Sequence, residues 1–392
     1  MKVVIAVDSF KGCLSSLEAG KAAAEGVREA VPGAEIALVR AADGGEGTLE
    51  ALAGSGRAEI RTARVTGPLG APVEARWGYV KRAEGAPAAV IEMAEAAGLA
   101  RVPEAKRDPM GTTTAGVGEL IAEAFRAGCR EFLVGIGGSA TNDCGIGMLE
   151  ALGFRFTRAD GAEAGSFGRD LEGIGAIDAS GVLPGLLSCR FRAACDVDNP
   201  LCGPRGCSAV FGPQKGASPE TIARMDAWIG SFARIAEKER DCPGASGKPG
   251  SGAAGGLGFA LSVFLGAELV PGAELLLDAA GLPEALPGAD LVITGEGRLD
   301  AQTEGGKTPA GAAKLARKIA PRALIVALAG SAAREGGKGP GSGLFDAVFP
   351  IVPGPVTLAE AMEPERARRN LAATAREAAR LVSKALNRGQ NR

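Results

Sequence analysis

The sequence predicts an α/β protein whose sheets are mainly parallel, and three observations support this. Apolar strand-like runs alternate with helix-like runs along most of the 392 residues, which is the pattern of successive βαβ units. Hydrophobic residues make up 46% of the chain but aromatic residues only 4%, so a large core must be built from aliphatic side chains and alanine. Two segments containing Pro and Gly, 66–72 and 286–289, predict hinges between a domain made from both chain ends and a second domain inserted between them. The alternative is that both segments are ordinary surface turns.

The N-terminal elements follow from apolar runs and capping residues. Residues 2–7 form an apolar run that predicts a buried strand. A helix should follow, from the capping box Ser15-x-x-Glu18 to about Val31. A second strand is expected at residues 36–40.

The middle of the chain continues the alternation. A helix that begins near residue 113 is expected to end at Gly128, because its apolar residues recur at helical spacing and glycine suits a C-terminal cap. The strand 132–136, a Gly-rich loop and a helix near 145–152 should follow.

The remaining elements are predicted on the same grounds. Residues 241–256 predict a flexible loop that leads into a helix. A terminal helix should begin at Thr357, where Glu360 completes a second capping box. Further strands are expected near residues 88–92, 191–195, 290–294, 323–329 and 346–350.

Composition excludes several classes of function. The chain contains no histidine, so a Ser-His-Asp triad, His-ligated zinc and a phosphohistidine are excluded, and a general base must be Asp, Glu, Lys, Tyr or Cys. The net charge of −2 argues against nucleic acid as a partner. The longest uncharged stretch, 249–267, is rich in Gly and Ser, so a membrane span is not expected. The eight cysteines form no C-x-x-C pair and the N-terminus shows no targeting segment, which together predict reduced thiols and a cytoplasmic location.

The most informative loop follows the predicted strand near 290–294. It carries Glu296, Arg298 and Asp300, and Lys307 comes shortly after. Ligands of open α/β sheets bind beyond the carboxyl ends of strands, so this loop predicts a site for an anion and a metal. The sequence Gly-Lys-Thr around Lys307 is similar to the end of a P-loop, but Ala301 stands where that motif requires glycine, so a Walker-type NTPase is excluded.

Two further loops follow the first two strands. Asp8, Ser9 and Lys11 precede a helix N-terminus, which favours anions; the alternative is that Asp8 and Lys11 pair or cap the helix. Asp43 and Glu46 lie in a glycine-rich loop, and carboxylate oxygens of this kind can hold Mg²⁺. The alternative for Asp43 is a helix N-cap.

Three more loops complete the pattern. A cradle for a phosphate or carboxylate is predicted before the helix near 145–152, made by Gly137, Gly138, Ser139, Thr141 and Asn142. Asp196 follows a predicted strand and could orient a hydroxyl or hold a metal. Lys215 could meet a phosphate, with a solvated lysine as the alternative. Carboxylates, anion-binding loops and lysines without histidine fit phosphoryl transfer, in which positioning and charge neutralisation dominate.

Ten motifs in order resemble the type I glycerate kinase family along nearly the whole chain, from Met1 to about Pro355. They are DSFKG, ADGGEGT, VTGPLG, GTTTAGVGELI, GIGGSATND, ACDVDNPL, AVFGPQKGA, GAAGGLG, DLVITGEGRLD and GKTPAGAAKLA. The resemblance implies phosphorylation of glycerate from ATP with Mg²⁺, giving 2-phosphoglycerate more often than 3-phosphoglycerate. It also implies a Rossmann-like domain from residues 1–72 and 288–392, an inserted α/β domain at 73–287, and an active site in the cleft between them.

Roles for the reaction are assigned as hypotheses on this resemblance. Asp196 is the first candidate for the base that accepts the hydroxyl proton, and Asp43 is the second. Lys11 should neutralise the transferring phosphoryl group, and the loop 137–142 should cradle an anion. Near the C-terminal quarter, the expected Mg²⁺ ligands are Glu296 and Asp300, and the cations expected to face phosphates are Arg298 and Lys307.

Two alternatives stay open. The same loops would serve a kinase of another small hydroxy acid. The second alternative is a non-catalytic metabolite-binding protein. Many members of the family it resembles carry histidine where this chain has Gly305, so a residue that could contribute to catalysis there is missing here. In each case small molecules are the expected partners, without nucleic acid or membrane, and a homodimer is compatible with the sequence.

Overall fold

The computed structural model describes residues 1–10, 12–39, 49, 56, 58–82, 85–299, 307–332 and 343–390. The chain divides into two compact units. Unit 1 comprises Met1–Ala51 and Pro271–Arg392, and unit 2 comprises Leu52–Val270. The predicted hinges do not coincide with these boundaries, because segment 66–72 lies inside unit 2 and segment 286–289 inside unit 1.

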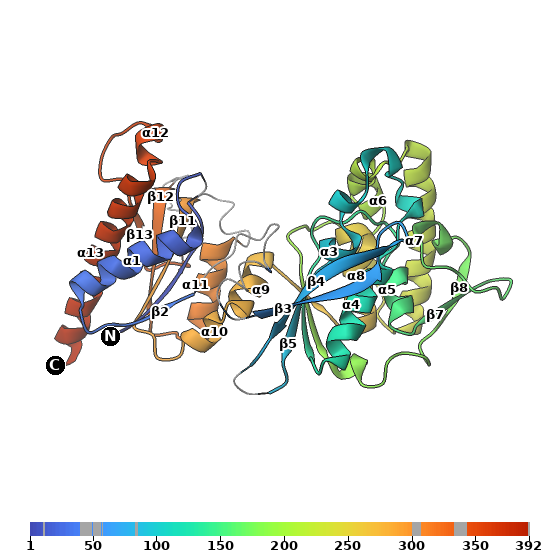
Figure 1. The fold of residues 1–392 in the computed structure, drawn as a ribbon, viewed down its shortest axis with the longest axis horizontal. Helices are drawn as coiled ribbons and strands as arrows, with labels where there is room; N and C mark the ends of the chain where they lie inside the picture. The colour runs from blue at the N-terminus through green and yellow to red at the C-terminus, as the bar shows by residue number, and fades with distance from the viewer. Residues whose placement is uncertain are drawn as a thin grey trace. The chain divides into compact units, whose positions relative to one another are not determined.

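Unit 1 is built on a five-stranded parallel sheet of strand order β13-β12-β11-β1-β2 (Figure 1). Helices lie on both faces of the sheet, so the predicted Rossmann-like, parallel-sheet architecture is confirmed. The elements of unit 1 are β1 (Lys2–Val7), α1 (Ser16–Ala30), β2 (Glu35–Leu38), α9 (Gly272–Ala279), α10 (Leu282–Ala285), β11 (Leu291–Leu299), α11 (Thr308–Ile319), β12 (Leu324–Ala332), β13 (Ala347–Pro350), α12 (Leu358–Ala361) and α13 (Pro364–Gln390).

The order of these strands reverses between β1 and β11. From β1 the chain continues through α1 to β2 on one side, whereas β11 leads through α11 to β12 on the other. The two strands are paired, with Val7 beside Gly295, and the N–H of Asp8 donates to the carbonyl of Gly295 at 2.8 Å. The carboxyl ends of β1 and β11 therefore form a topological switch point, where ligands of such sheets bind.

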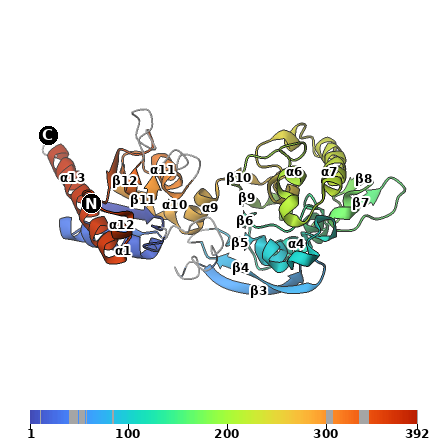
Figure 2. The same ribbon diagram turned by 90° about the horizontal axis from the view of Figure 1, so that it is seen from above.

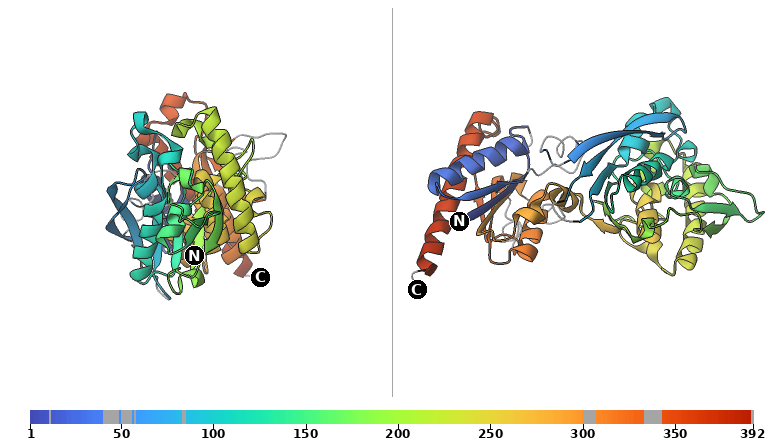
Figure 3. Two further views of the ribbon diagram at one scale, coloured as in Figure 1. Left: turned by 90° about the vertical axis from the view of Figure 1, so that its right-hand side faces the viewer. Right: turned by 60° about the horizontal axis from the view of Figure 1, so that its bottom comes forward.

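Two helices cover one face of this sheet. Figures 2 and 3 show α13 alongside α1, with α11 on the opposite face. Val3, Ile5 and Val7 point into a core shared with α1 and α13. The helices approach closely at Gly26, where an added Cβ would lie 1.9 Å from the carbonyl oxygen of Ala372. Only glycine fits at that crossing.

Unit 2 is built on a six-stranded sheet of order β10-β9-β6-β5-β4-β3. The strands β5, β6, β9 and β10 are parallel, while β3 and β4 form an antiparallel hairpin. Its strands and α-helices are β3 (Ala58–Thr66), β4 (Pro72–Val80), β5 (Ala88–Glu92), α3 (Ala94–Ala97), α4 (Ala115–Arg126), β6 (Glu131–Gly135), α5 (Ile146–Ala151), β7 (Arg155–Arg158), β8 (Ile174–Asp178), β9 (Arg190–Ala194), α6 (Cys207–Phe211), α7 (Pro219–Glu239), α8 (Ala253–Leu265) and β10 (Glu268–Val270). Seven 3₁₀ turns complete the described part of the unit: η1 (Leu99–Arg101), η2 (Glu104–Lys106), η3 (Pro109–Gly111), η4 (Gly168–Leu171), η5 (Leu186–Ser188), η6 (Pro213–Lys215) and η7 (Ala245–Gly247).

A large buried cluster of unit 2 covers one face of its sheet. Phe132 of β6 and Phe191 of β9 stack with ring centroids 4.6 Å apart, and both belong to a buried cluster with α4, α5, α7 and α8. The carboxyl ends of β5, β6 and β9 meet at one edge of this sheet, so the loops after these strands are neighbours.

Most predicted elements are present, and two differences stand out. Both capping boxes are formed, at Ser15 and at Thr357. The predicted terminal helix is two helices, because α12 ends at Ala361 and Pro364, which cannot donate a helical hydrogen bond, begins α13. The segment 66–72 is the turn of the β3–β4 hairpin, and both strands were missed. No helix in the described ranges is long and apolar enough to cross a membrane.

Candidate functional site

The switch point of unit 1 gathers five of the predicted residues. Asp8 and Ser9 follow β1 directly, and the Asp8 side chain, with only 6% of the residue exposed, accepts the N–H of Ser9 at 2.6 Å. Glu296 and Arg298 lie near the carboxyl end of strand β11, and Lys307 is the N-cap of α11. The Lys307 ammonium lies 3.8 Å from the Glu296 carboxylate, so cation and carboxylate share one edge of the sheet.

Three predicted residues cannot be placed beside them. Lys11, Asp43 and Asp300 lie outside the described residues. The roles assigned to them therefore stay predictions.

The second group of predicted residues follows β6 in unit 2. Gly137 and Gly138 are exposed, and the chain then turns inward. The carbonyl of Gly138 accepts the N–H of Leu99 at 2.8 Å, and the N–H of Ala140 donates to Ala97 at 2.9 Å. These two bonds fix the loop against the segment after α3 and place Ser139 at the border between solvent and core.

The start of α5 is already occupied by a carboxylate of the protein. Asp143 is fully buried and accepts the N–H of Thr114 at 2.7 Å, the Thr114 hydroxyl at 2.7 Å and the N–H of Gly145 at 3.2 Å. The Thr114 hydroxyl in turn accepts the N–H of Met148 at 3.0 Å. Burial raises the pKa of Asp143, and the hydrogen bonds from Thr114, Gly145 and Gly147 oppose that rise. The first turn of α5 is thus satisfied internally, so this helix end is not free to bind an anion as the sequence suggested.

Two glycines of α8 support the same loop from below. Residues 254–256 have left-handed backbone angles, and the Gly255 carbonyl accepts the N–H of Cys144 at 2.9 Å. A Cβ on Gly255 would lie 2.1 Å from the carbonyl oxygen of Thr141, and one on Gly256 would lie 2.8 Å from the Cys144 sulfur. The motif GAAGGLG therefore allows two backbones to touch, which explains its glycines in physical terms.

Lys215 lies beneath the loop and is only 1% exposed. Its ammonium donates to the Ser139 hydroxyl oxygen at 2.7 Å and to the carbonyl of Thr141 at 2.6 Å. Burial lowers the pKa of Lys215 to about 8, while Cys207 and Asp143 raise it. The alternative of a solvated lysine is wrong, because η6 places this side chain inside the unit.

Two polar atoms of the loop are buried without a partner. Among the described residues, no hydrogen bond reaches the Thr141 hydroxyl oxygen or the Asn142 side-chain carbonyl. The Asn142 amide donates to the Ser208 hydroxyl at 2.9 Å. Unsatisfied buried polar atoms are costly and few in folded proteins, so these two atoms distinguish the loop from the rest of the described core.

Asp196 follows β9, the neighbour of β6 in the sheet, and is exposed. Its loop is tied to the segment before α8, because the N–H of Leu201 donates to Ser246 at 2.9 Å and the N–H of Gly252 donates to Asn199 at 3.0 Å. The predicted flexible loop 241–256 is instead packed in this part.

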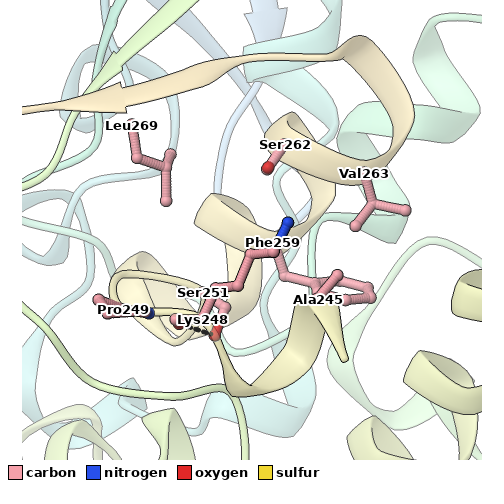
Figure 4. A pocket seen from close by; sticks show the side chains of 8 residues that line it. All are labelled: Ala245, Lys248, Pro249, Ser251, Phe259, Ser262, Val263 and Leu269. Carbon is pink, nitrogen blue, oxygen red and sulfur yellow. Dashed lines mark hydrogen bonds between the residues drawn. The ribbon is translucent and has the colours of Figure 1, made fainter. Parts of the chain in front are cut away.

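A small pocket lies in the same region (Figure 4). Its volume is about 280 Å³. Gly250, which lies between two residues that line the pocket, packs against Cys195. Its lining is mainly apolar and contains none of the predicted site residues: Ala245, Lys248, Pro249, Ser251, Phe259, Ser262, Val263 and Leu269. The pocket is therefore not assigned to the candidate site.

The structure thus places the predicted residues in two groups, each within one unit. Unit 1 holds Asp8, Ser9, Glu296, Arg298 and Lys307, and unit 2 holds Gly137, Gly138, Ser139, Thr141, Asn142, Asp196 and Lys215. The supporting residues Asp143, Thr114 and Gly255 were not predicted as site residues. Their only signal in the sequence is that they stand in the motifs GIGGSATND, GTTTAGVGELI and GAAGGLG.

Several known proteins to which this chain is similar are described as glycerate kinases. The family model for the glycerate kinase family matches residues 3–383. The glycerate kinase of Bacillus subtilis (strain 168) is 45% identical over 384 residues, covering 95% of this chain and 97% of that protein. The glycerate 2-kinase of Escherichia coli (strain K12) is 45% identical over 379 residues, covering 95% and 98%. A crystal structure of the protein assigned as glycerate kinase 2 from Salmonella typhimurium LT2 covers 100% of both chains with a TM-score of 0.77 and 44% identity. The chain therefore belongs to the glycerate kinase family.

Proposed function

We propose that this enzyme transfers the γ-phosphoryl group of ATP to a hydroxyl of glycerate, with 2-phosphoglycerate as the product. The observation that carries the proposal is the 45% identity to a glycerate 2-kinase across 95% of the chain. The geometry agrees with it, because two parallel-sheet edges present carboxylates, lysines and exposed glycines without any histidine.

In the proposed reaction the glycerate hydroxyl oxygen attacks the γ-phosphorus as the bond to the ADP oxygen breaks. The hydroxyl proton passes to a carboxylate, for which Asp196 is the first candidate and Asp43 the second. Asp196 suits this role because it is exposed at the carboxyl end of β9. Lys11 is proposed to neutralise the transferring group, since phosphoryl transfer depends mainly on positioning and electrostatics.

The switch point of unit 1 is the proposed place for the triphosphate. Lys307 and Arg298 supply positive charge there, and α11 begins at the same edge. Mg²⁺ sites in kinases use one or two carboxylates together with substrate phosphates. The described residues contain no group of three potential metal ligands, but Glu296 fits as one ligand, with Asp300 as the proposed second. The ion would supply charge neutralisation between phosphate oxygens.

The loop after β6 is the proposed anion site of unit 2, with Ser139 and Lys215 at its centre. Both units are thus proposed to serve one reaction. The eight cysteines are free thiols, which fits a reducing compartment, and we place the enzyme in the cytoplasm.

An ADP-release assay tests the proposal. The purified protein is supplied with ATP and one of glycerate, glycolate, lactate or tartronate, each with Mg²⁺ and with EDTA. Glycerate should give the highest kcat/KM, only with Mg²⁺, and NMR of the product should show phosphate on the 2-hydroxyl. Preference for another acid would instead indicate a kinase of that acid, and binding of glycerate without ADP formation would indicate a non-catalytic protein.

A further inference from the structure

The Ser139 hydroxyl is held in one orientation by Lys215. A lysine ammonium can only donate hydrogen bonds, so the Ser139 oxygen is the acceptor in their 2.7 Å contact. A hydroxyl also has one hydrogen to donate, and no described residue accepts it. Because that hydrogen must avoid the ammonium, it is directed away from Lys215. Ser139 is 8% exposed, which places its hydroxyl at the inner limit of solvent access.

The backbone beside Ser139 supplies further donors. Gly137 and Gly138 are exposed, and no described residue accepts a hydrogen bond from the N–H of Gly137, Gly138 or Ser139. A Cβ on Gly137 would meet no atom within 4 Å, so the loop is not closely packed at this residue. Three N–H groups and one hydroxyl thus lie together at the loop and lack acceptors.

Lys215 lacks a counterion. In the described chain no carboxylate forms an ion pair with its ammonium, and Asp143, the carboxylate that affects the pKa of Lys215, already accepts hydrogen bonds from Thr114 and Gly145. A buried cation without a counterion is strongly destabilising. The backbone carbonyl of Thr141 accepts a hydrogen bond from Lys215. The hydroxyl of the same residue is buried and has no hydrogen-bond partner among the described residues.

We propose that Ser139, oriented by Lys215, donates its hydroxyl hydrogen to the carboxylate of the hydroxy-acid substrate, with the N–H groups of Gly137 and Gly138 as further donors. This assignment rests on the proposed function and decides which anion the loop binds. One buried positive charge matches a monoanionic carboxylate. A triphosphate carries several charges and needs metal and multiple cations, which the described part of this loop does not provide. Ser139 touches the substrate, and Lys215 is a positioning residue.

The charge on Lys215 makes the proposal sensitive to pH. Two titratable groups act on it, the Cys207 thiol of α6 and the Asp143 carboxylate before α5. Burial raises the pKa of Cys207 to about 11, so this thiol stays neutral where Lys215 titrates. As the pH rises through about 8, Lys215 loses its charge, and Ser139 becomes a weaker donor. The KM for glycerate should therefore rise above pH 8, while the KM for ATP changes less.

Two variants test the inference by steady-state kinetics, and two others serve as controls. Ser139→Ala should raise the KM for glycerate roughly 10- to 100-fold, the usual worth of one hydrogen bond to a charged group, with kcat and the KM for ATP within about threefold of wild type by the same reasoning. Lys215→Met should raise the same KM and abolish its rise above pH 8. Ser188→Ala and Lys238→Met, exposed residues outside the loop, are matched controls that should leave both constants unchanged. Circular dichroism confirms that each variant is folded.

The outcomes separate this inference from the proposed function. An unchanged KM for glycerate in Ser139→Ala, or a rise in the KM for ATP instead, would overturn the carboxylate assignment. A wild-type protein without turnover would refute the kinase activity alone. In that case calorimetric titration with glycerate still decides, because Ser139→Ala must bind it more weakly than wild type and Ser188→Ala must not.

Discussion

The carboxylate of Asp143 accepts two hydrogen bonds of 2.7 Å from Thr114, one from its backbone N–H and one from its hydroxyl. This pair joins the start of α4 to the start of α5, two elements separated by the strand β6. It thereby fixes both ends of the segment that carries Ser139. The loop that carries Ser139 is thus stabilised by a buried hydrogen-bond network inside the unit.

Asp143→Ala should strongly destabilise unit 2. The change leaves the Thr114 N–H, the Thr114 hydroxyl and the Gly145 N–H buried without an acceptor, and each such loss costs about 1–3 kcal/mol. Thr114→Val removes only the hydroxyl and should cost about 1–3 kcal/mol. Urea unfolding measures both changes, with Asp160→Ala at an exposed turn as control. A loss below about 1 kcal/mol for Asp143→Ala would show that the network is not structural.

Lys215 should make stability rise with pH. Its pKa is about 8 in the folded protein, below the usual 10.5. Below pH 8 both folded and unfolded states bind the proton, and the folded state carries the full cost of the buried charge. Between pH 8 and 10.5 the unfolded state binds more protons, so the free energy of unfolding increases, by about 3 kcal/mol in total. The measured quantity is the free energy of unfolding of the wild type minus that of Lys215→Met. Urea unfolding at a series of pH values from 7 to 10.5 gives this difference. A flat difference would show that Lys215 titrates normally.

Local signals explain what the sequence predicted well. The capping boxes at Ser15 and Thr357 need only residues within one turn, and β1 needs only its own apolar run. The loops after β6, β9 and β11 were identified because glycines and polar residues follow apolar strands. Such patterns are readable from adjacent residues alone.

The missing parts depend on contacts between distant residues. Lys215 gives no sign in its own segment that it is buried, because its partner Ser139 lies 76 positions away. The hairpin β3–β4 pairs over nine residues, yet the Pro and Gly of its turn are also typical of a domain linker. The position of Gly255 becomes meaningful only once Thr141 is seen against it.

Gly255→Ala should displace the loop after β6. Its φ is +67°, and an added Cβ would lie 2.1 Å from the Thr141 carbonyl. Gly266 is a matched control, because its φ is +66° and an added Cβ would meet nothing within 4 Å. Gly266→Ala should therefore cost only the left-handed backbone strain, about 1–2 kcal/mol. Gly255→Ala should cost more and should also raise the KM for glycerate. Equal stability losses and unchanged kinetics in both variants would contradict the close contact.

Glu296→Gln should increase the Mg²⁺ concentration needed for half-maximal activity. The substitution keeps the shape of the side chain but removes the charge that suits a hard cation. Titration of activity with MgCl₂ at fixed ATP measures the shift, expected to be at least roughly tenfold, because loss of even an outer-shell partner of a metal ligand costs about 10- to 100-fold in metal affinity. Glu239→Gln, at the exposed end of α7, is the control. An unchanged Mg²⁺ requirement would remove Glu296 as a ligand.

Asp196→Asn should lower kcat without a matching change in either KM. A positioned general base contributes about 10²- to 10⁴-fold to rate, and an amide of the same size cannot accept the hydroxyl proton. Asp198→Asn is the matched control, because Asp198 is exposed two residues further on and pairs with Arg205 at 3.1 Å, an ion pair whose loss should matter little. Full turnover by Asp196→Asn would exclude it as the base. The same measurement on Asp43→Asn would then test the second candidate, because in a chain without histidine a carboxylate is one of the few side chains that can accept the proton.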